Sequence, residues 1–266
     1  MASPKSDLLT KEPRVVRSVV HASGLLKALH KNGRPTSLSD LARKIELSKP
    51  ATYVLLRTLE EAGLISRDAA ARYELSWGVY ELGSAVIRPV GLARAARLHL
   101  DHLAERTGEA VLLAILDNAA VLYLDRGQEH ESFRMVANIG RRSPLHTNAS
   151  GKVLLAYQGA AYIEAIATRP LAPTTSLTIT DGQALIAELT RVRERGYATC
   201  SQEQEIGLSS IAVPVFAGQG RMLAALAVAG PTSRFTQHQL PILLNELRGT
   251  SADISRHLSQ PGGLPR

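Results

Sequence analysis

The sequence predicts an α+β protein, with an N-terminal winged helix-turn-helix unit and a larger C-terminal domain in which helices cover an antiparallel sheet. Three observations predict this fold. Apolar residues recur at helical spacing through residues 15–62, and an alternating hairpin follows them. From residue 110 onward, short apolar strands are interspersed with further helices. The 266 residues are also enough for one large domain or two ordinary ones.

The composition is that of a globular protein with an uneven charge. Hydrophobic residues make up 45% and charged residues 21% of the chain. The formal net charge is +7, of which residues 1–90 supply +5, from 14 Lys and Arg against 9 Asp and Glu. Residues 91–266 supply the other +2, from 17 against 15. A polyanionic partner is therefore expected for the N-terminal third rather than for the whole chain.

Cysteine usage and hydropathy indicate the compartment. Cys200 is the only cysteine, so neither an intrachain disulfide nor a cysteine-based zinc site can form. The N-terminus lacks the apolar segment of a signal peptide, and no run approaches the roughly 20 apolar residues of a membrane helix. We therefore expect a cytoplasmic protein with no membrane partner.

The N-terminal domain is expected over residues 14–76, after a flexible tail at 1–13. Ser37 and Ser48 are residue types that cap a helix N-terminus, and Gly63 suits the left-handed position after a helix. The expected elements are helices over 15–30, 38–45 and 49–62, then a hairpin of 64–67 with 72–75. The inward face of the third helix is expected to consist of Val54, Leu55, Leu59 and Ala62.

This order of elements suits DNA. A helix-turn-helix places its second helix in the major groove, and a hairpin wing can reach neighbouring phosphates. Here the groove helix is 49–62, the hairpin is the wing, and the serine before the preceding helix is expected to meet a phosphate. An ordinary solvated helical bundle with scattered charges is the alternative. The expected DNA contacts are Ser37, Lys49, Thr52, Tyr53, Arg57, Arg67 and Arg72.

The rest of the chain predicts a linker helix over 77–92 and a second domain over 93–266. Residues 140–148 are expected to form a polar loop. The expected strands are 110–116, 121–125, 132–137, 196–199, 210–216 and 222–229. The expected helices are 92–106, one that opens near residue 149, 162–168, 183–195 and 237–258.

Catalytic motifs are incomplete. A phosphate-binding loop around Gly151-Lys152 would need glycine and Ser or Thr where the chain has His146 and Val153. A triad of His146, Ser150 and Glu203 lacks the Gly-x-Ser-x-Gly elbow around its serine. We expect no catalytic residue.

The sequence supports a metal site no better than it supports a catalytic site. His99 and His102 lie three residues apart on a helix, but no carboxylate or cysteine is spaced to complete a site with them. They are expected at the surface or at an interface. We expect no metal and no cofactor.

Five sequence blocks recur in order along the chain: VVRSVVHASGLLKALHKNGRPTSLSDLARKIELSKPATYVLLRTLEEAGLISRD, YELSWGVYELG, PLHTNASGKVLLA, RERGYATCSQEQEIGLSSIAVPVF and ALAVAGPTSRF. Taken together, they resemble the IclR family of bacterial transcription regulators over roughly residues 14–258. The resemblance implies a winged helix, a linker helix and a GAF-like α/β effector-binding domain. It also implies a homodimer or homotetramer on a palindromic double-stranded operator.

The resemblance also implies an effector pocket. A helix start at Ala149, Ser150 and Gly151 matches the family's backbone cradle for a carboxylate, with Lys152 at the pocket entrance. The chain departs from the family where an acidic residue is replaced around Cys200, and where a common cysteine is Ser210. The remaining expected pocket residues are Ser132, Phe133, Met135, Glu203, Ala227 and Ala229.

Alanines at 227 and 229 make the pocket wall less polar than in members with serines there. They are equally compatible with plain strand packing. The expected effector is therefore a small organic acid with an apolar or aromatic body. The expected function is a DNA-binding repressor or activator of a catabolic pathway; the alternative is a metabolite-binding protein or enzyme with an incidental basic N-terminal domain.

Overall fold

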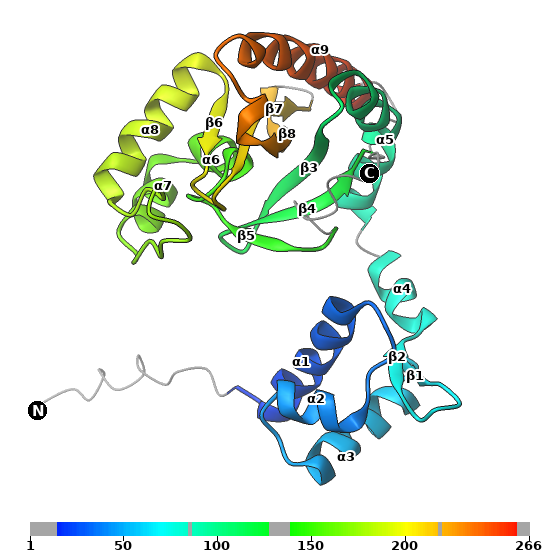
Figure 1. Ribbon diagram of the computed structural model, residues 1–266. Coiled ribbons are helices and arrows are strands. Elements are labelled where there is room, and N and C mark those ends of the chain that lie inside the picture. The colour runs from blue at the N-terminus through cyan, green and yellow to red at the C-terminus, as the bar shows by residue number, and fades with distance from the viewer. Residues whose placement is uncertain (1–14, 85–86, 128–138, 218–219, 260–266) are drawn as a thin grey trace, which may run out of the picture. The chain divides into compact units, whose positions relative to one another are not determined.

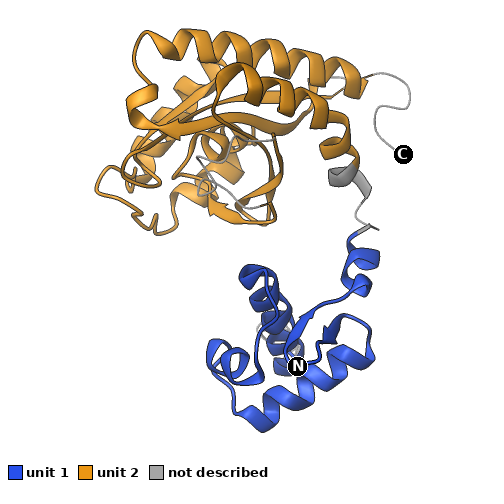
Figure 2. Cartoon of the chain, turned by 45° about the vertical axis from the view of Figure 1, so that its right-hand side comes forward, with its two compact units in different colours: residues 1–86 blue, residues 87–266 orange. Residues whose placement is uncertain are grey.

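The computed structural model describes residues 15–84, 87–127, 139–217 and 220–259. The chain divides into two compact units, residues 1–86 and 87–266 (Figure 2). We call them the N-terminal and C-terminal units and describe each by itself.

The N-terminal unit is a three-helix core with a small hairpin and a fourth helix. Ser37 accepts a hydrogen bond from the Asp40 N–H and Ser48 from the Ala51 N–H, so both predicted caps are present. Gly63 follows α3 with a φ of 72°, the left-handed conformation expected of it. The elements are α1 (Arg17–Asn32), α2 (Leu38–Lys44), α3 (Lys49–Glu61), β1 (Ile65–Arg67), β2 (Tyr73–Leu75) and α4 (Trp77–Ser84) (Figure 1).

The inward face of α3 agrees with the predicted one at Leu55 and Leu59 but differs from it at Val54 and Ala62. Thr52, Leu56 and Leu59 are its buried residues, whereas Val54 is 62% exposed and Ala62 is also exposed. The prediction grouped apolar side chains and left Thr52 outside, but the helix packs along the 52–56–59 stripe at three- and four-residue steps. The core it joins consists of Leu25, Leu29, Leu41, Leu56, Leu59, Ile65 and Tyr73.

The hairpin turn closes without glycine. Asp68 Oδ1 accepts from the N–H groups of Ala70 at 2.9 Å and Arg72 at 2.8 Å. Ala71 takes a positive φ of 59° within this turn. The Asp68 carboxylate therefore stabilises the turn by hydrogen bonds to its backbone, while Ala71 adopts the left-handed conformation that glycine usually supplies.

The C-terminal unit is one antiparallel sheet between two helical layers. The strand order is β5-β4-β3-β8-β7-β6, so β5 and β6 are the two edge strands of the sheet. Its helices are α5 (Ile87–Thr107), α6 (Ala149–Ala156), α7 (Ala160–Ala167), α8 (Gly182–Arg195) and α9 (Gln239–Ser259). Its strands are β3 (Ala110–Asp117), β4 (Ala120–Arg126), β5 (Arg142–Pro144), β6 (Ala198–Ser201), β7 (Leu208–Phe216) and β8 (Met222–Pro231). A short 3₁₀ turn, Thr232–Arg234, separates β8 from α9.

The two faces of the sheet carry different side chains, because successive strand residues point to opposite sides. One face packs on α5 and α9, and the other on α6, α7 and α8 (Figure 1). The α5 face is built from bulky residues, among them Val111, Leu113, Ile211, Val213, Leu226 and Val228. The α6 face is rich in alanine: Ala110, Ala114, Ala198, Ala212, Ala225, Ala227 and Ala229.

The predicted α+β fold class is confirmed, with shifts at several element ends. The segment predicted as a polar loop contains the edge strand β5, whose three residues pair with β4. Helix α5 begins at Ile87, inside the range predicted for a single linker helix that starts at residue 77. The predicted strand 132–137 lies outside the described residues.

Candidate nucleic-acid interface and ligand site

The outer face of α3 presents a row of polar side chains. Lys49, Tyr53 and Arg57 recur every four residues and are all exposed, which places them on one side of the helix. Arg57 also pairs with Glu61 at 3.2 Å, and this hydrogen bond raises the pKa of its guanidinium. The row combines cations and a phenol hydroxyl, which can bind phosphates or base edges.

Thr52 does not belong to this row, and its prediction as a solvent-facing contact is wrong. Its side chain is 0% exposed, and its hydroxyl donates to the Ser48 carbonyl at 3.0 Å. The residue therefore tightens the first turn of α3. Val54, which the prediction placed inside, occupies the exposed face instead.

The wing holds two further predicted cations. Arg67 and Arg72 are both exposed. The guanidinium of Arg67 lies 5.8 Å from the centre of the Tyr73 ring, and Arg72 Nε donates to Asp68 Oδ2 at 2.8 Å. The N–H of Arg72 also lowers the pKa of Asp68. Both arginines are positioned by neighbours while their outer edges face solvent.

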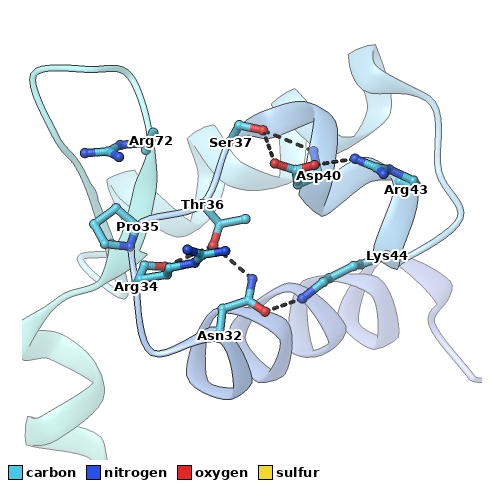
Figure 3. Close-up of a pocket in the computed structure, with 9 residues that line it drawn as sticks. All are labelled: Asn32, Arg34, Pro35, Thr36, Ser37, Asp40, Arg43, Lys44 and Arg72. Carbon is cyan, nitrogen blue, oxygen red and sulfur yellow. Dashed lines mark hydrogen bonds and ion pairs between the residues drawn. The ribbon is translucent and has the colours of Figure 1, made fainter.

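A pocket of about 480 Å³ lies between the wing, α2 and the end of α1 (Figure 3). Two of its residues, Ser37 and Arg72, were predicted as phosphate contacts; the others were missed, because they come from separate segments that no local motif joins. The lining residues are Asn32, Arg34, Pro35, Thr36, Ser37, Asp40, Arg43, Lys44 and Arg72.

Ser37 is held inside this pocket by its capping role. Its hydroxyl accepts from the Asp40 N–H at 3.2 Å and donates to Asp40 Oδ2 at 2.8 Å. The carboxylate of Asp40 also pairs with Arg43. These contacts fix the start of α2.

The C-terminal unit places the predicted carboxylate cradle at the start of α6. Asn148 caps this helix: its Oδ1 accepts from the Gly151 N–H at 2.8 Å, and its carbonyl accepts from the Lys152 N–H. Ala149 and Ser150 are buried, and within the described part of the chain their N–H groups make no hydrogen bond. Two donors at a helix N-terminus thus remain for an anion.

Gly151 has a packing reason of its own. A Cβ at this position would lie 2.2 Å from the carbonyl oxygen of Leu145. Only glycine lets the first turn of α6 approach the preceding backbone this closely.

Four predicted pocket residues lie on neighbouring rows of the alanine-rich face. Cys200 of β6 pairs with Ser210 of β7, which in turn pairs with Ala229 of β8 and completes one row across the strands. In the next row on the same face, Ala212 pairs with Ala227. The Cys200 thiol donates to the Thr147 carbonyl at 3.3 Å, and burial raises its pKa. This contact links the row to the loop that leads into α6.

Lys152 and Glu203 form a buried ion pair behind the cradle. Lys152 Nζ donates to Glu203 Oε1 at 2.6 Å and to the Thr199 carbonyl at 3.4 Å. The lysine side chain is 2% exposed, so its prediction at a pocket entrance is wrong. Glu203 Oε2 is buried and has no hydrogen-bond partner among the described residues.

Tyr123 is a residue of this region that the sequence did not single out. It lies on β4, belongs to the core of the alanine-rich face and is 4% exposed. Burial raises its pKa to about 12, and Cys200 and Arg141 are near enough to influence it. Ser132, Phe133 and Met135 lie outside the described residues.

The imagined triad is not assembled. The Nε2 of His146 lies 3.0 Å from the Ala172 carbonyl oxygen, and Glu203 is engaged by Lys152. Across the described ranges no group of three or more His, Cys, Asp or Glu could hold a metal ion. No helix in those ranges combines the length and apolar character that crossing a bilayer requires.

Comparison with known families decides what kind of protein carries these two sites. The helix-turn-helix domain model of IclR matches residues 18–69, and the model of the bacterial transcriptional regulator IclR C-terminal domain matches residues 84–256. The chain belongs to the IclR family. The predicted resemblance is thereby confirmed over both units.

Relatives within the IclR family span nearly the whole chain. The HTH-type transcriptional regulator KdgR of Escherichia coli is 33% identical over 252 residues, covering 94% of this chain and 95% of its own. The probable transcriptional regulator SauR of Cupriavidus necator is 37% identical over 233 residues, covering 87% and 92%.

Solved structures agree. An IclR homologue from Microbacterium hydrocarbonoxydans, complexed with 4-hydroxybenzoate, is 25% identical with a TM-score of 0.80, covering 90% of this chain and 98% of its own. The Thermotoga maritima IclR is 31% identical with a TM-score of 0.75, covering 92% and 99%. The chain is thus a helix-turn-helix transcriptional regulator by family.

Proposed function

We propose that this IclR-family regulator binds a palindromic operator in double-stranded DNA through α3 and the wing, and that a small organic acid in the C-terminal unit controls it. The observation that carries the DNA part is the exposed row of Lys49, Tyr53 and Arg57 on α3. A helix of this diameter fits the major groove, where such side chains reach base edges.

Each contact has its own role. Arg57 can bind two acceptors of a guanine, and Tyr53 supplies a hydroxyl to a base or a phosphate. Lys49 at the helix start, with Arg67 and Arg72 on the wing, suits phosphates, which position the protein without reading sequence. A homodimer or homotetramer would present paired α3 helices to the two half-sites.

The effector part is supported by the start of α6. The N–H groups of Ala149 and Ser150 are buried donors at a helix N-terminus, where a carboxylate is stabilised. The alanine-rich rows nearby, which include Ala227 and Ala229, offer an apolar surface to the body of such an acid. The related structure in complex with 4-hydroxybenzoate, an aromatic carboxylic acid, supports this ligand class.

Regulation requires that the acid distinguish two states of the oligomer. An effector that binds one state more tightly shifts the population toward it, and DNA affinity changes by the same coupling free energy. We place the winged helix-turn-helix at residues 14–76, the linker at 77–92 and the effector domain at 93–266. The regulated genes are expected to encode a catabolic pathway.

Two measurements test the proposal separately. A footprint with the full-length protein on the DNA upstream of its own gene, at low salt, is expected to protect a palindrome. Absence of any footprint there, and of any duplex selected from random DNA, would reject the DNA part. Calorimetry with benzoate-like and keto acids is expected to give binding that shifts the footprint; binding only of sugars or amines would reject the effector part.

A further inference from the structure

Two cations of the pocket in the N-terminal unit have no negatively charged partner in the part of the chain that the structure describes. Arg34 lies in the loop between α1 and α2, and Lys44 ends α2. No carboxylate of the described residues lies within ion-pair distance of either side chain. Arg43 and Arg72, by contrast, pair with Asp40 and Asp68. The pocket therefore contains two cationic groups whose charge no described carboxylate balances.

A chain of hydrogen bonds orders the wall between these cations. Lys44 Nζ donates to Asn32 Oδ1, Asn32 Nδ2 donates to Thr36 Oγ1 at 2.9 Å, and Thr36 Oγ1 donates to the Arg34 carbonyl at 3.0 Å (Figure 3). Thr36 is 7% exposed, and its backbone bridges to Tyr73 of the wing. The chain holds the Lys44 ammonium and the backbone of Arg34 at the wall of one pocket before any ligand arrives.

We propose that this pocket, which no residue of α3 lines, binds one phosphodiester group of the DNA backbone with Arg34 and Lys44 as its ligands. The proposal rests on the DNA binding proposed above. A phosphodiester carries one negative charge and two unesterified oxygens. A guanidinium can donate to two oxygens at once, and an ammonium acts as a point charge beside them.

The position of the pocket favours backbone over base. Its walls come from the end of α1, the loop between α1 and α2, α2 itself and the wing residue Arg72, and no residue of α3 lines it. Arg72 already links it to the wing, which was predicted to meet phosphates. A phosphate held here would fix the register of α3 in the groove without reading a base.

Salt dependence and a neutralised phosphate together test the proposal. A duplex is first selected from random-sequence DNA by the full-length protein, and its affinity is measured over a range of KCl concentrations. Arg34→Gln and Lys44→Gln are each expected to reduce the log–log salt slope, by about 1 in total for the one phosphate that they share, with the preference for the selected duplex retained. Lys31→Gln removes an exposed cation of the same unit that does not line the pocket, and it is expected to leave the slope unchanged.

A scan with single methylphosphonates, which are uncharged, then locates the contact. The native protein is expected to lose affinity at one phosphate per half-site, and Arg34→Gln is expected to lose none there. Arg34→Lys should restore part of the slope. Because both cations are exposed, neither substitution is expected to change the melting temperature. If Arg34→Gln lowers the melting temperature, the salt slope of Lys44→Gln tests the proposal in its place.

The outcomes separate the two proposals. If the native protein selects no duplex, DNA binding itself fails, and the pocket assignment fails with it. If it binds DNA but Arg34→Gln and Lys44→Gln keep the slope of Lys31→Gln, only the pocket assignment is overturned.

Discussion

Lys152 of α6 and Glu203, which follows β6, meet in the interior of the C-terminal unit, with Nζ and Oε1 2.6 Å apart. The lysine side chain is 2% exposed and the glutamate side chain 12%. The pair ties the first turn of α6 to the end of an edge strand. A ligand bound at the N–H groups of Ala149 and Ser150 would therefore lie next to a lysine whose charge Glu203 already neutralises.

Lys152→Met is expected to lower the free energy of unfolding by about 3–5 kcal/mol, because it leaves the Glu203 carboxylate buried without its cation. Urea unfolding measures this change in the free energy of unfolding. Arg256→Met breaks the exposed pair with Asp253 and should cost at most about 1 kcal/mol. The double variant Lys152→Met/Glu203→Leu should recover part of the loss; equal costs for the buried and exposed pairs would contradict the prediction.

Gly151→Ala is expected to destabilise the protein by about 2 kcal/mol or more, since its Cβ would lie 2.2 Å from the Leu145 carbonyl. Gly249→Ala is the matched control. It lies within α9, where an added Cβ meets nothing within 4 Å, so it should stabilise by about 0.5–1 kcal/mol. Thermal denaturation of both variants should give shifts of opposite sign.

Thr52→Val is expected to change stability and not sequence preference. The substitution keeps the buried volume and removes the hydrogen bond to Ser48, a loss of about 1 kcal/mol. Tyr53→Ala, at a neighbouring position that is 42% exposed, should weaken DNA binding without lowering the melting temperature. A changed operator preference in Thr52→Val would show that this side chain reaches DNA after all.

Arg57→Ala is expected to reduce the discrimination between operator and unrelated DNA, by about 1–3 kcal/mol if it binds a base. Arg72→Ala should instead lower affinity for both duplexes and reduce the salt slope by about 1. Competition binding at several salt concentrations distinguishes these effects. Equal losses on both duplexes for Arg57→Ala would assign it to a phosphate.

Stability is expected to fall between pH 10 and pH 12 because of Tyr123. Its pKa is about 12 in the folded protein and near 10 in a free side chain. Within that window the unfolded state releases the proton and the folded state keeps it, so unfolding becomes more favourable by about 1.4 kcal/mol per pH unit at most. Tyr123→Phe should remove this part of the decline, whereas Tyr80→Phe, which alters an exposed phenol, should not.

Local signals made much of the fold predictable. Ser37, Ser48 and Gly63 mark helix ends through hydrogen bonds and dihedral angles within a few residues, and the structure confirms all three. The edge strand β5 escaped prediction because its three residues show no alternation and exist as a strand only by pairing with β4.

The sites depended on contacts that sequence does not display. Lys152 and Glu203 are 51 residues apart, and nothing local to either signals that they meet. The resemblance implied Cys200, Ser210 and Ala229 as members of one pocket but did not show that they lie side by side. That alignment depends on the register of the strands that carry them. The inward turn of Thr52 was missed because a hydroxyl that satisfies its own helix can be buried as readily as an apolar group.

The contrast between the two faces of the sheet bears on how this chain can diverge. Alanines line the α6 side of β8 while leucine and valine fill the α5 side, from alternate positions of the same strand. Enlarging Ala227 or Ala229 would therefore reshape one side without disturbing the interdigitated packing of the other. The ligand preference of one surface of the sheet can therefore change while the packing of the opposite surface preserves the fold.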